Sequence, residues 1–171
     1  MDIKEIELKP LDGIKIGEII INFGTKLEKV DTLLRESLGE TYENEYNDIC
    51  IYRDNNDIFE YIEFGYNSLV SYNISIYGHS LFEIPIRDLY NILSEHCENI
   101  YEEITGITHY IFEDIGVRFD IEYTDGNPDW TEEEWDDKDE YEFYAVTSIG
   151  IGTKKYINER IKKSKFTTKI S

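Results

Sequence analysis

Apolar side chains recur at the spacing of an α-helix in two segments of the chain. The first segment has its apolar positions at Leu27, Val30, Leu34 and Leu38, and the second at Ile86, Leu89, Leu93 and Cys97. Intervals of three, four and four residues place each set along one face of a helix. The pattern therefore predicts two amphipathic helices, each with one buried face.

The ends of the predicted helices carry residues typical of helix termini. Thr25 and Glu28 have the spacing of a capping box, in which each side chain accepts a hydrogen bond from a backbone N–H at the other residue. Gly39 follows the first helix, where glycine commonly ends the helical backbone, and Pro85 precedes the second.

Alternating apolar and polar residues predict β-strands after each helix. They fall near 49–54, 58–65 and 69–77, and again near 108–113, 117–123 and 141–151. One or two more strands are expected within residues 3–9 and 14–23. Because the links between consecutive strands are short, we expect antiparallel pairing.

An offset of 59 residues superposes the two helices and the strands that follow them, so that Ile62, Glu63 and Phe64 match Ile121, Glu122 and Tyr123. A constant offset of this kind indicates an internal repeat. We therefore predict an α+β fold in which an antiparallel sheet has two helices on one face. It would consist of two helix-plus-three-strand repeats, about 22–78 and about 81–152, within a single domain of residues 1–161.

The two predicted repeats differ in one connection. The first links its second and third strands with about four residues, whereas the second uses seventeen, residues 124–140. The stretch from Asp129 to Tyr144, DWTEEEWDDKDEYEFY, holds nine carboxylates and one lysine. Long insertions in compact domains are usually functional or disordered, so this insertion is the main candidate for a recognition element.

The chain contains 37 acidic and 17 basic residues, which gives a formal net charge of −20. A negative charge of this size repels nucleic acid, anionic membranes and phosphate-rich substrates, and attracts basic proteins or cations. The C-terminal end differs, because residues 153–171 hold seven Lys and Arg but only one acid, Glu159. Residues 162–171 are therefore predicted to form a basic, solvated C-terminal tail.

Few residues have the spacing that metal binding or catalysis requires. Cys50 and Cys97 lack metal-ligand spacing and are expected in the core, whereas His79, His96 and His109 are expected at the surface or a sheet edge. The sequence contains no nucleophile elbow and no glycine-rich phosphate loop. We therefore expect no enzymatic activity, no metal site and no cofactor.

Part of the insertion follows a calcium-loop pattern. The residues at the ligand positions are Asp125, Asn127, Asp129, Glu133 and Asp136. Trp130 stands where the loop requires glycine for a sharp turn, and the last ligand is not the longer glutamate. Specific calcium binding is therefore not favoured.

The N-terminal residues MDIKEIELK lack the long apolar run of a signal peptide. No stretch of the sequence approaches the length of an apolar membrane span. A cytoplasmic location without membrane contact is therefore expected.

Two tryptophans distinguish the insertion from an ordinary acidic linker. Trp130 and Trp135 lie outside the predicted strands and are flanked by carboxylates, which is the composition of a binding surface with rigid aromatic contacts and a charged rim. The alternative is that the rings only pin the loop to the body of the protein. The predicted partner-binding residues are Trp130, Glu132, Glu133, Glu134, Trp135, Asp136, Asp137, Asp139 and Glu140.

The segment INFGTKLEKVDTLLRESLGE, residues 21–40, resembles the repeat of the bacterial SmpA/OmlA outer-membrane lipoproteins and β-lactamase-inhibitor-like proteins. In that repeat a glycine before the helix, a valine inside it and a Leu-Gly pair at its end precede a small sheet. The corresponding residues are Gly24, Val30, Leu38 and Gly39. Glu83 and Glu98 replace both glycines in the second half, and the envelope role of those lipoproteins is not carried over.

As a whole, the chain resembles the small, acidic, tandem-repeat immunity proteins encoded beside bacterial polymorphic toxins. The similar segments are LFEIPIRDLYNIL, FEDIGVRFDIEY and VTSIGIG. The resemblance implies a non-enzymatic protein that neutralises a cognate toxin, such as a basic nuclease, by covering its active or substrate-binding surface. An acidic domain whose charge serves only solubility and a nucleic-acid mimic that binds DNA-binding proteins are the alternatives.

Overall fold

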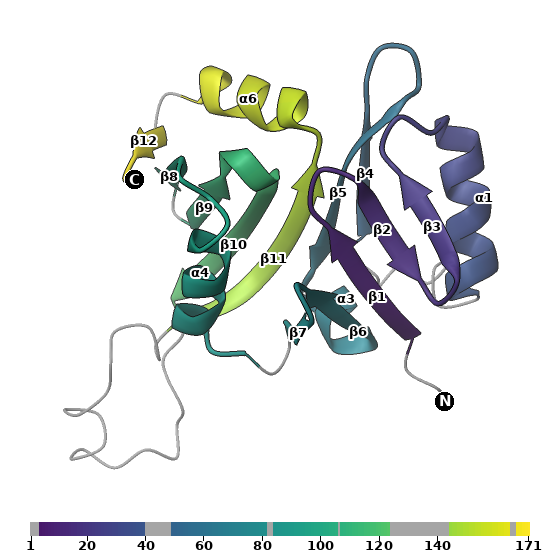
Figure 1. Ribbon diagram of the computed structural model, residues 1–171, viewed down its shortest axis with the longest axis horizontal. Coiled ribbons are helices and arrows are strands. Elements are labelled where there is room, and N and C mark those ends of the chain that lie inside the picture. The colour runs from purple at the N-terminus through teal and green to yellow at the C-terminus, as the bar shows by residue number, and fades with distance from the viewer. Residues whose placement is uncertain (1–3, 40–48, 82–83, 106, 124–143, 165–166) are drawn as a thin grey trace.

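The chain folds into two β-sheets with short helices packed around them, as the computed structural model shows (Figure 1). The structure describes residues 4–39, 49–81, 84–105, 107–123, 144–164 and 167–171. The α+β class expected from the sequence is confirmed. The expectation of one sheet is wrong, because the strands divide between two.

The smaller sheet has five strands in the order β3-β2-β1-β6-β7. Their bounds are β1 (Lys4–Lys9), β2 (Gly13–Ile16), β3 (Ile19–Asn22), β6 (Tyr72–Ile76) and β7 (His79–Ser80). β1 and β6 pair in parallel, and the other neighbours pair antiparallel. One or two strands were expected within residues 3–9 and 14–23, and the structure has three there, β1, β2 and β3.

The larger sheet has seven strands in the order β12-β8-β9-β10-β11-β5-β4, all paired antiparallel. Their bounds are β4 (Ile49–Arg53), β5 (Phe59–Gly65), β8 (Ile100–Ile104), β9 (Thr108–Phe112), β10 (Val117–Tyr123), β11 (Tyr144–Gly152) and β12 (Thr167–Lys169). Five of these strands, β4, β5, β9, β10 and β11, were expected from the alternation of apolar residues, whereas β8 and β12 were not.

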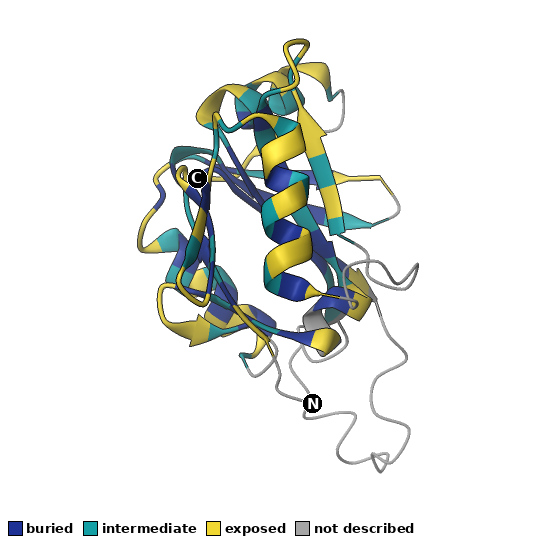
Figure 2. Cartoon of the chain, turned by 90° about the vertical axis from the view of Figure 1, so that its right-hand side faces the viewer, coloured by how far each residue is buried: buried dark blue, intermediate teal, exposed yellow. Residues whose placement is uncertain are grey.

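The described residues also form α1 (Leu27–Leu38), α3 (Tyr66–Ser71), α4 (Ile86–Ser94), α6 (Lys154–Lys163) and the 3₁₀ turn η1 (Glu113–Ile115). The residues predicted to face inward on α1 and α4 are buried, apart from the half-buried Leu27. The second helix is shorter than predicted, because α4 ends at Ser94 and the buried Cys97 lies beyond it. Figure 2 shows α1 with buried and exposed residues on opposite sides of the helix.

The predicted capping box does not start α1. Lys26 is the residue before the helix, and no side chain caps the helical N–H groups. Thr25 is held instead by pairing with β5, since the Phe59 N–H donates to the Thr25 carbonyl at 2.9 Å. The Leu27 N–H donates to the Asp57 carbonyl at 2.9 Å, so this first helical N–H is satisfied by backbone from a distant turn.

The predicted pair of equivalent repeats is not confirmed. The helices and the first two strands keep the offset, but the third strands belong to different sheets: β6 pairs with β1, whereas β11 pairs with β10 and β5. The link expected to be a four-residue turn at 65–68 is part of the helix α3. A short helix fits this position because the chain leaves one sheet there and enters the other.

Helices cover both faces of the seven-stranded sheet, because α6, a helix that was not predicted from the sequence, lies on the face opposite α4. On β9, Tyr110 and Phe112 point to the face where Tyr90 of α4 meets both rings, at centroid distances of 5.3 and 5.6 Å. Ile111 points to the opposite face, where it packs with Ile157 of α6. The face under α4 adjoins the main core and is called the inner face, and the face under α6 is called the outer face.

The basic C-terminal end is part of the fold rather than a solvated tail. α6 is attached to β5 by an ion pair between Lys155 Nζ and Glu60 Oε1 at 2.8 Å. After α6 the chain returns to the sheet, where β12 pairs with β8 and the Ile100 N–H donates to the Ser171 carbonyl at 3.0 Å. The unpaired N–H and C=O groups along the edge of β8 explain this return, because they accept another strand.

Asp114 in η1 holds the turn between α4 and β8. Its Oδ2 atom accepts the backbone N–H groups of Glu98 at 3.0 Å and Asn99 at 2.9 Å, and the Asn99 side-chain amide at 2.9 Å. Burial by itself would raise the pKa of Asp114. The hydrogen bonds from Asn99 and Glu98 outweigh this effect and hold the pKa below its ordinary value of 3.8.

Asp114→Asn is expected to lower the free energy of unfolding by about 1–2 kcal/mol at neutral pH, because the hydrogen bonds lose their charged acceptor. A depressed carboxyl pKa stabilises the fold above the unfolded-state pKa, and this stability is lost as the pH falls through the folded pKa. The difference in unfolding free energy between Asp114→Asn and the parent should therefore become smaller below about pH 4. Urea denaturation across this range measures it, with the exposed Asp88→Asn as control. A gap independent of pH contradicts the assignment.

Candidate functional site

Polar side chains form a row across the outer face of the seven-stranded sheet. Strand pairing places Glu103 of β8 beside His109 of β9, His109 beside Asp120 of β10, and Asp120 beside Ser148 of β11. All four residues are buried. Ser148 Oγ donates to Asp120 Oδ2 at 2.8 Å. We call these four residues the polar row.

Arg118 lies next to the polar row on the same face, and its side chain is only 6% exposed. Its Nε atom lies 3.0 Å from Asp120 Oδ1, an ion pair without the alignment of a hydrogen bond, and Nη1 lies 3.4 Å from Glu63 Oε2. Burial by itself would lower the pKa of Arg118, but the charges of Asp120, Tyr61 and Glu63 outweigh it and raise the pKa. Arg118 is therefore a buried cation held between two carboxylates.

His109 is buried against Arg118 and Asp120, so its expected surface position is wrong, whereas His79 and His96 are exposed as expected. Its Nδ1 atom lies 2.6 Å from Arg118 Nη2 and 2.8 Å from Asp120 Oδ1, and Nε2 lies 2.9 Å from Thr105 Oγ1. Nδ1 thus faces both the Arg118 donor and an Asp120 carboxylate oxygen, so which ring nitrogen donates depends on the tautomer.

An aromatic group closes the other end of the outer face. Tyr61 is fully buried and stacks on Tyr156 of α6 with ring centroids 4.6 Å apart. Its hydroxyl donates to Glu63 Oε2 at 3.1 Å. Burial, and then the charge of Glu63, raise the pKa of Tyr61 well above its ordinary value. The ring lies over Gly150 of β11, where the absence of a side chain leaves room for it.

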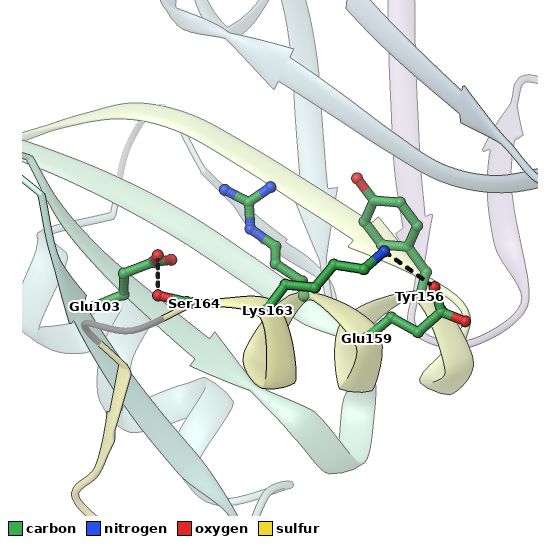
Figure 3. A pocket seen from close by; sticks show the side chains of 6 residues that line it. Glu103, Tyr156, Glu159, Lys163 and Ser164 are labelled. Carbon is green, nitrogen blue, oxygen red and sulfur yellow. Dashed lines mark hydrogen bonds and ion pairs between the residues drawn. The ribbon is translucent and has the colours of Figure 1, made fainter.

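A pocket of about 340 Å³ lies along α6 beside the Glu103 end of the polar row (Figure 3). Its lining residues are Glu103, Tyr156, Glu159, Arg160, Lys163 and Ser164. Glu103 Oε1 accepts a hydrogen bond from Ser164 Oγ at 2.5 Å, and Lys163 Nζ lies 3.5 Å from Glu159 Oε2. The pocket therefore contains two carboxylates and two cationic side chains.

The insertion predicted to bind a partner connects two neighbouring strands of this sheet. Tyr123 at the end of β10 pairs with Tyr144 at the start of β11, which confirms the expected hairpin connection. The partner-binding residues predicted from Trp130 to Glu140, and the calcium-loop pattern from Asp125 to Asp136, lie outside the described residues. The described residues on either side of the insertion are Tyr123, three residues after Asp120, and Tyr144, four residues before Ser148.

The buried charges on the outer face were not predicted from the sequence. Arg118 and Asp120 alternate with the inward-facing apolar residues of β10, a pattern that normally indicates a solvated face. In the structure both side chains are buried, next to Glu63 of β5 and His109 of β9. Cys97 is buried as expected, but Cys50 is exposed.

Within the described ranges, no three His, Cys, Asp or Glu side chains come close enough to hold a metal ion. No helix among the same residues is long and apolar enough to cross a membrane. Comparison of the chain with known protein families, curated proteins and solved structures finds no match.

Proposed function

We propose that this protein is a non-enzymatic acidic binding protein that acts in the cytoplasm and neutralises a basic partner, in the manner of an immunity protein that covers the active or substrate-binding surface of a bacterial toxin. The observation that carries the proposal is the pairing of Tyr123 with Tyr144. It attaches the most acidic segment of the chain, residues 124–143, to two adjacent strands of the larger sheet.

The anchoring strands form a firm base for recognition. β10 and β11 lie inside the sheet, between β9 and β5, and their inward-facing residues Phe119, Ile149 and Ile151 are fully buried. Anchors that do not move on binding reduce the entropy lost when a partner docks. An insertion on these strands is therefore better placed for recognition than one on an edge strand.

The charge distribution favours a basic partner. Residues 124–143 contain ten Asp and Glu but only one Lys. A concentrated acidic segment speeds association with a basic protein through long-range attraction, and the effect weakens as salt is added. Trp130 and Trp135 would provide the apolar contacts at the centre of such an interface.

The test is co-expression with the product of the neighbouring gene, measuring complex formation and protection of the host cell. We expect a stable complex whose association slows with salt. Replacing Glu132, Glu133, Glu134, Asp136 and Asp137 with Ser and Asn should weaken it on the order of 10- to 100-fold.

The matched control replaces five exposed acids elsewhere, so that both variants have the same net charge. These acids are Glu5, Glu18, Glu36, Glu95 and Glu98. The control should bind within about threefold of the parent. Equal weakening of both variants contradicts a dedicated recognition segment and favours a general charge effect, and failure to form any complex or protect the cell rejects the proposal.

A further inference from the structure

The pocket along α6 contains polar atoms that the protein leaves unsatisfied. Glu103 Oε2 and Arg160 Nε are both buried, and neither has a hydrogen-bond partner in the described part of the chain. Both residues line the pocket, and these two atoms do not bond to each other. Buried polar groups in native proteins are nearly always paired, and an unpaired one requires an explanation.

The protein fixes one oxygen of the Glu103 carboxylate and leaves the other without a partner among the described residues. Glu103 is 8% exposed, its backbone belongs to β8, and one carboxylate oxygen is fixed by Ser164. The hydroxyl of Thr167, which stands opposite Glu103 in the β8–β12 pair, also lacks a partner and therefore does not satisfy the free oxygen. The remaining lone pairs of Glu103 require a hydrogen-bond donor from outside.

The cationic side of the pocket comes from α6. Figure 3 shows Glu103 and Ser164 at one end, and the ammonium of Lys163 with Glu159 and Tyr156 toward the other. Arg160 hydrogen-bonds Tyr156 through its side chain, which leaves its Nε donor free. The pocket thus offers an acceptor at one end and donors along α6.

We propose that this pocket binds a small zwitterion of the free α-amino acid class, with its ammonium group on Glu103 and its carboxylate on Arg160 and Lys163. A ligand with both charges pairs with the Glu103 carboxylate and the Arg160 guanidinium together. A volume of about 340 Å³ lies at the lower end of the range of small-molecule pockets, which suits a ligand of this size. The described lining residues all lie outside the proposed recognition segment.

A basic side chain from a protein partner is the competing occupant. It would pair with Glu103, but it would bring a third positive charge beside Arg160 and Lys163 and leave the Arg160 donor unsatisfied. Like charges without a counterion are disfavoured at close range. The charge balance of the pocket therefore favours a zwitterion.

The test uses the full chain without any partner, so its result does not depend on the proposed toxin. Thermal unfolding is measured with each of the standard amino acids at equal concentration and ionic strength. Ethylamine and acetate serve as probes that carry only one of the two charges. At least one amino acid should raise the melting temperature as ligand binding to the folded state requires, and neither single-charge probe should do so.

Variants assign the binding to this pocket. Glu103→Gln should weaken calorimetrically measured binding on the order of 10- to 100-fold, because the charged hydrogen-bond acceptor is lost. Lys163→Gln should weaken it about two- to fivefold, because this lysine is exposed. Lys162→Gln is the matched control: it removes the same charge from the adjacent position on α6, which does not line the pocket.

Three results would overturn the proposal. One is that no amino acid shifts the melting temperature. Another is that ethylamine stabilises the protein as strongly as the best amino acid, which identifies a site for a basic group alone. The third is that Lys163→Gln and Lys162→Gln bind equally well, which places the ligand elsewhere even if Glu103→Gln does not fold.

Discussion

Arg118→Met is expected to lower the free energy of unfolding by about 3–5 kcal/mol, the cost of breaking a buried ion pair by removing one partner. Asp120 and Glu63 would lose the cation that lies 3.0 and 3.4 Å from their carboxylates. His109 would also lose its donor at 2.6 Å. Methionine keeps much of the side-chain volume, so the loss of stability reflects the missing charge and not a cavity. Urea denaturation monitored by circular dichroism measures it.

The matched control for Arg118→Met is Arg53→Met. Arg53 pairs with Asp57 on the surface, where its side chain is 55% exposed, and losing an exposed ion pair costs about 1 kcal/mol or less. Adding Glu63→Gln and Asp120→Asn to Arg118→Met should recover part of the lost stability, because no buried carboxylate then lacks a cation. Similar losses for Arg118→Met and Arg53→Met are inconsistent with a buried charge cluster.

Gly150→Ala is expected to cost about 3 kcal/mol, the upper part of the usual range for overpacking a core. A Cβ atom at this position would lie 2.0 Å from the Tyr61 hydroxyl and 2.3 Å from the adjacent ring carbon. Tyr61 cannot easily move, because it is fully buried and stacked on Tyr156. The substitution should therefore disturb the contact between α6 and the sheet, and thermal unfolding measures the loss.

A double-mutant cycle with Tyr61→Leu tests the cause. In the Tyr61→Leu background the smaller side chain leaves space over Gly150, so Gly150→Ala should cost about 1 kcal/mol or less. If Gly150→Ala costs the same in both backgrounds, the steric explanation is wrong and the backbone of β11 itself must require glycine.

The outer face carries a buried charge cluster and, beside it, the pocket for which a ligand is proposed. Arg118, Asp120 and His109 occupy its interior and contact one another, whereas Glu103 and Arg160 line the pocket. Both sets contain a buried atom without an aligned hydrogen bond, but Arg118 and Asp120 form an ion pair with each other. Substitutions at Arg118, Asp120 and His109 are therefore expected to change stability, and substitutions at Glu103 and Arg160 are expected to change ligand binding.

Several elements follow directly from local sequence. The apolar spacing of α1 and α4 determines which side of each helix is buried, because a helix repeats every 3.6 residues whatever it packs against. Alternation likewise determines β5 and β10. The short link between β4 and β5 makes antiparallel pairing the only practical arrangement, and the structure shows it.

Other features depend on contacts between distant parts of the chain. β6 and β11 are similar apolar strands, but one joins β1 and the other joins β5, which ends 79 residues before β11 begins. An apolar alternation reports that a strand is buried on one face and does not identify its neighbour. For this reason the sequence did not reveal that the strands form two sheets or that β12 pairs with β8. The predicted repeat is not confirmed for the same reason.

The candidate sites divide in the same way. The sequence by itself identified an acidic segment between two paired strands, because charge density and segment length are local properties. Only the tertiary structure revealed the buried cation Arg118 and the pocket at Glu103. Both lie on polar faces that look solvated in sequence and are buried because α6, from the far end of the chain, folds across them.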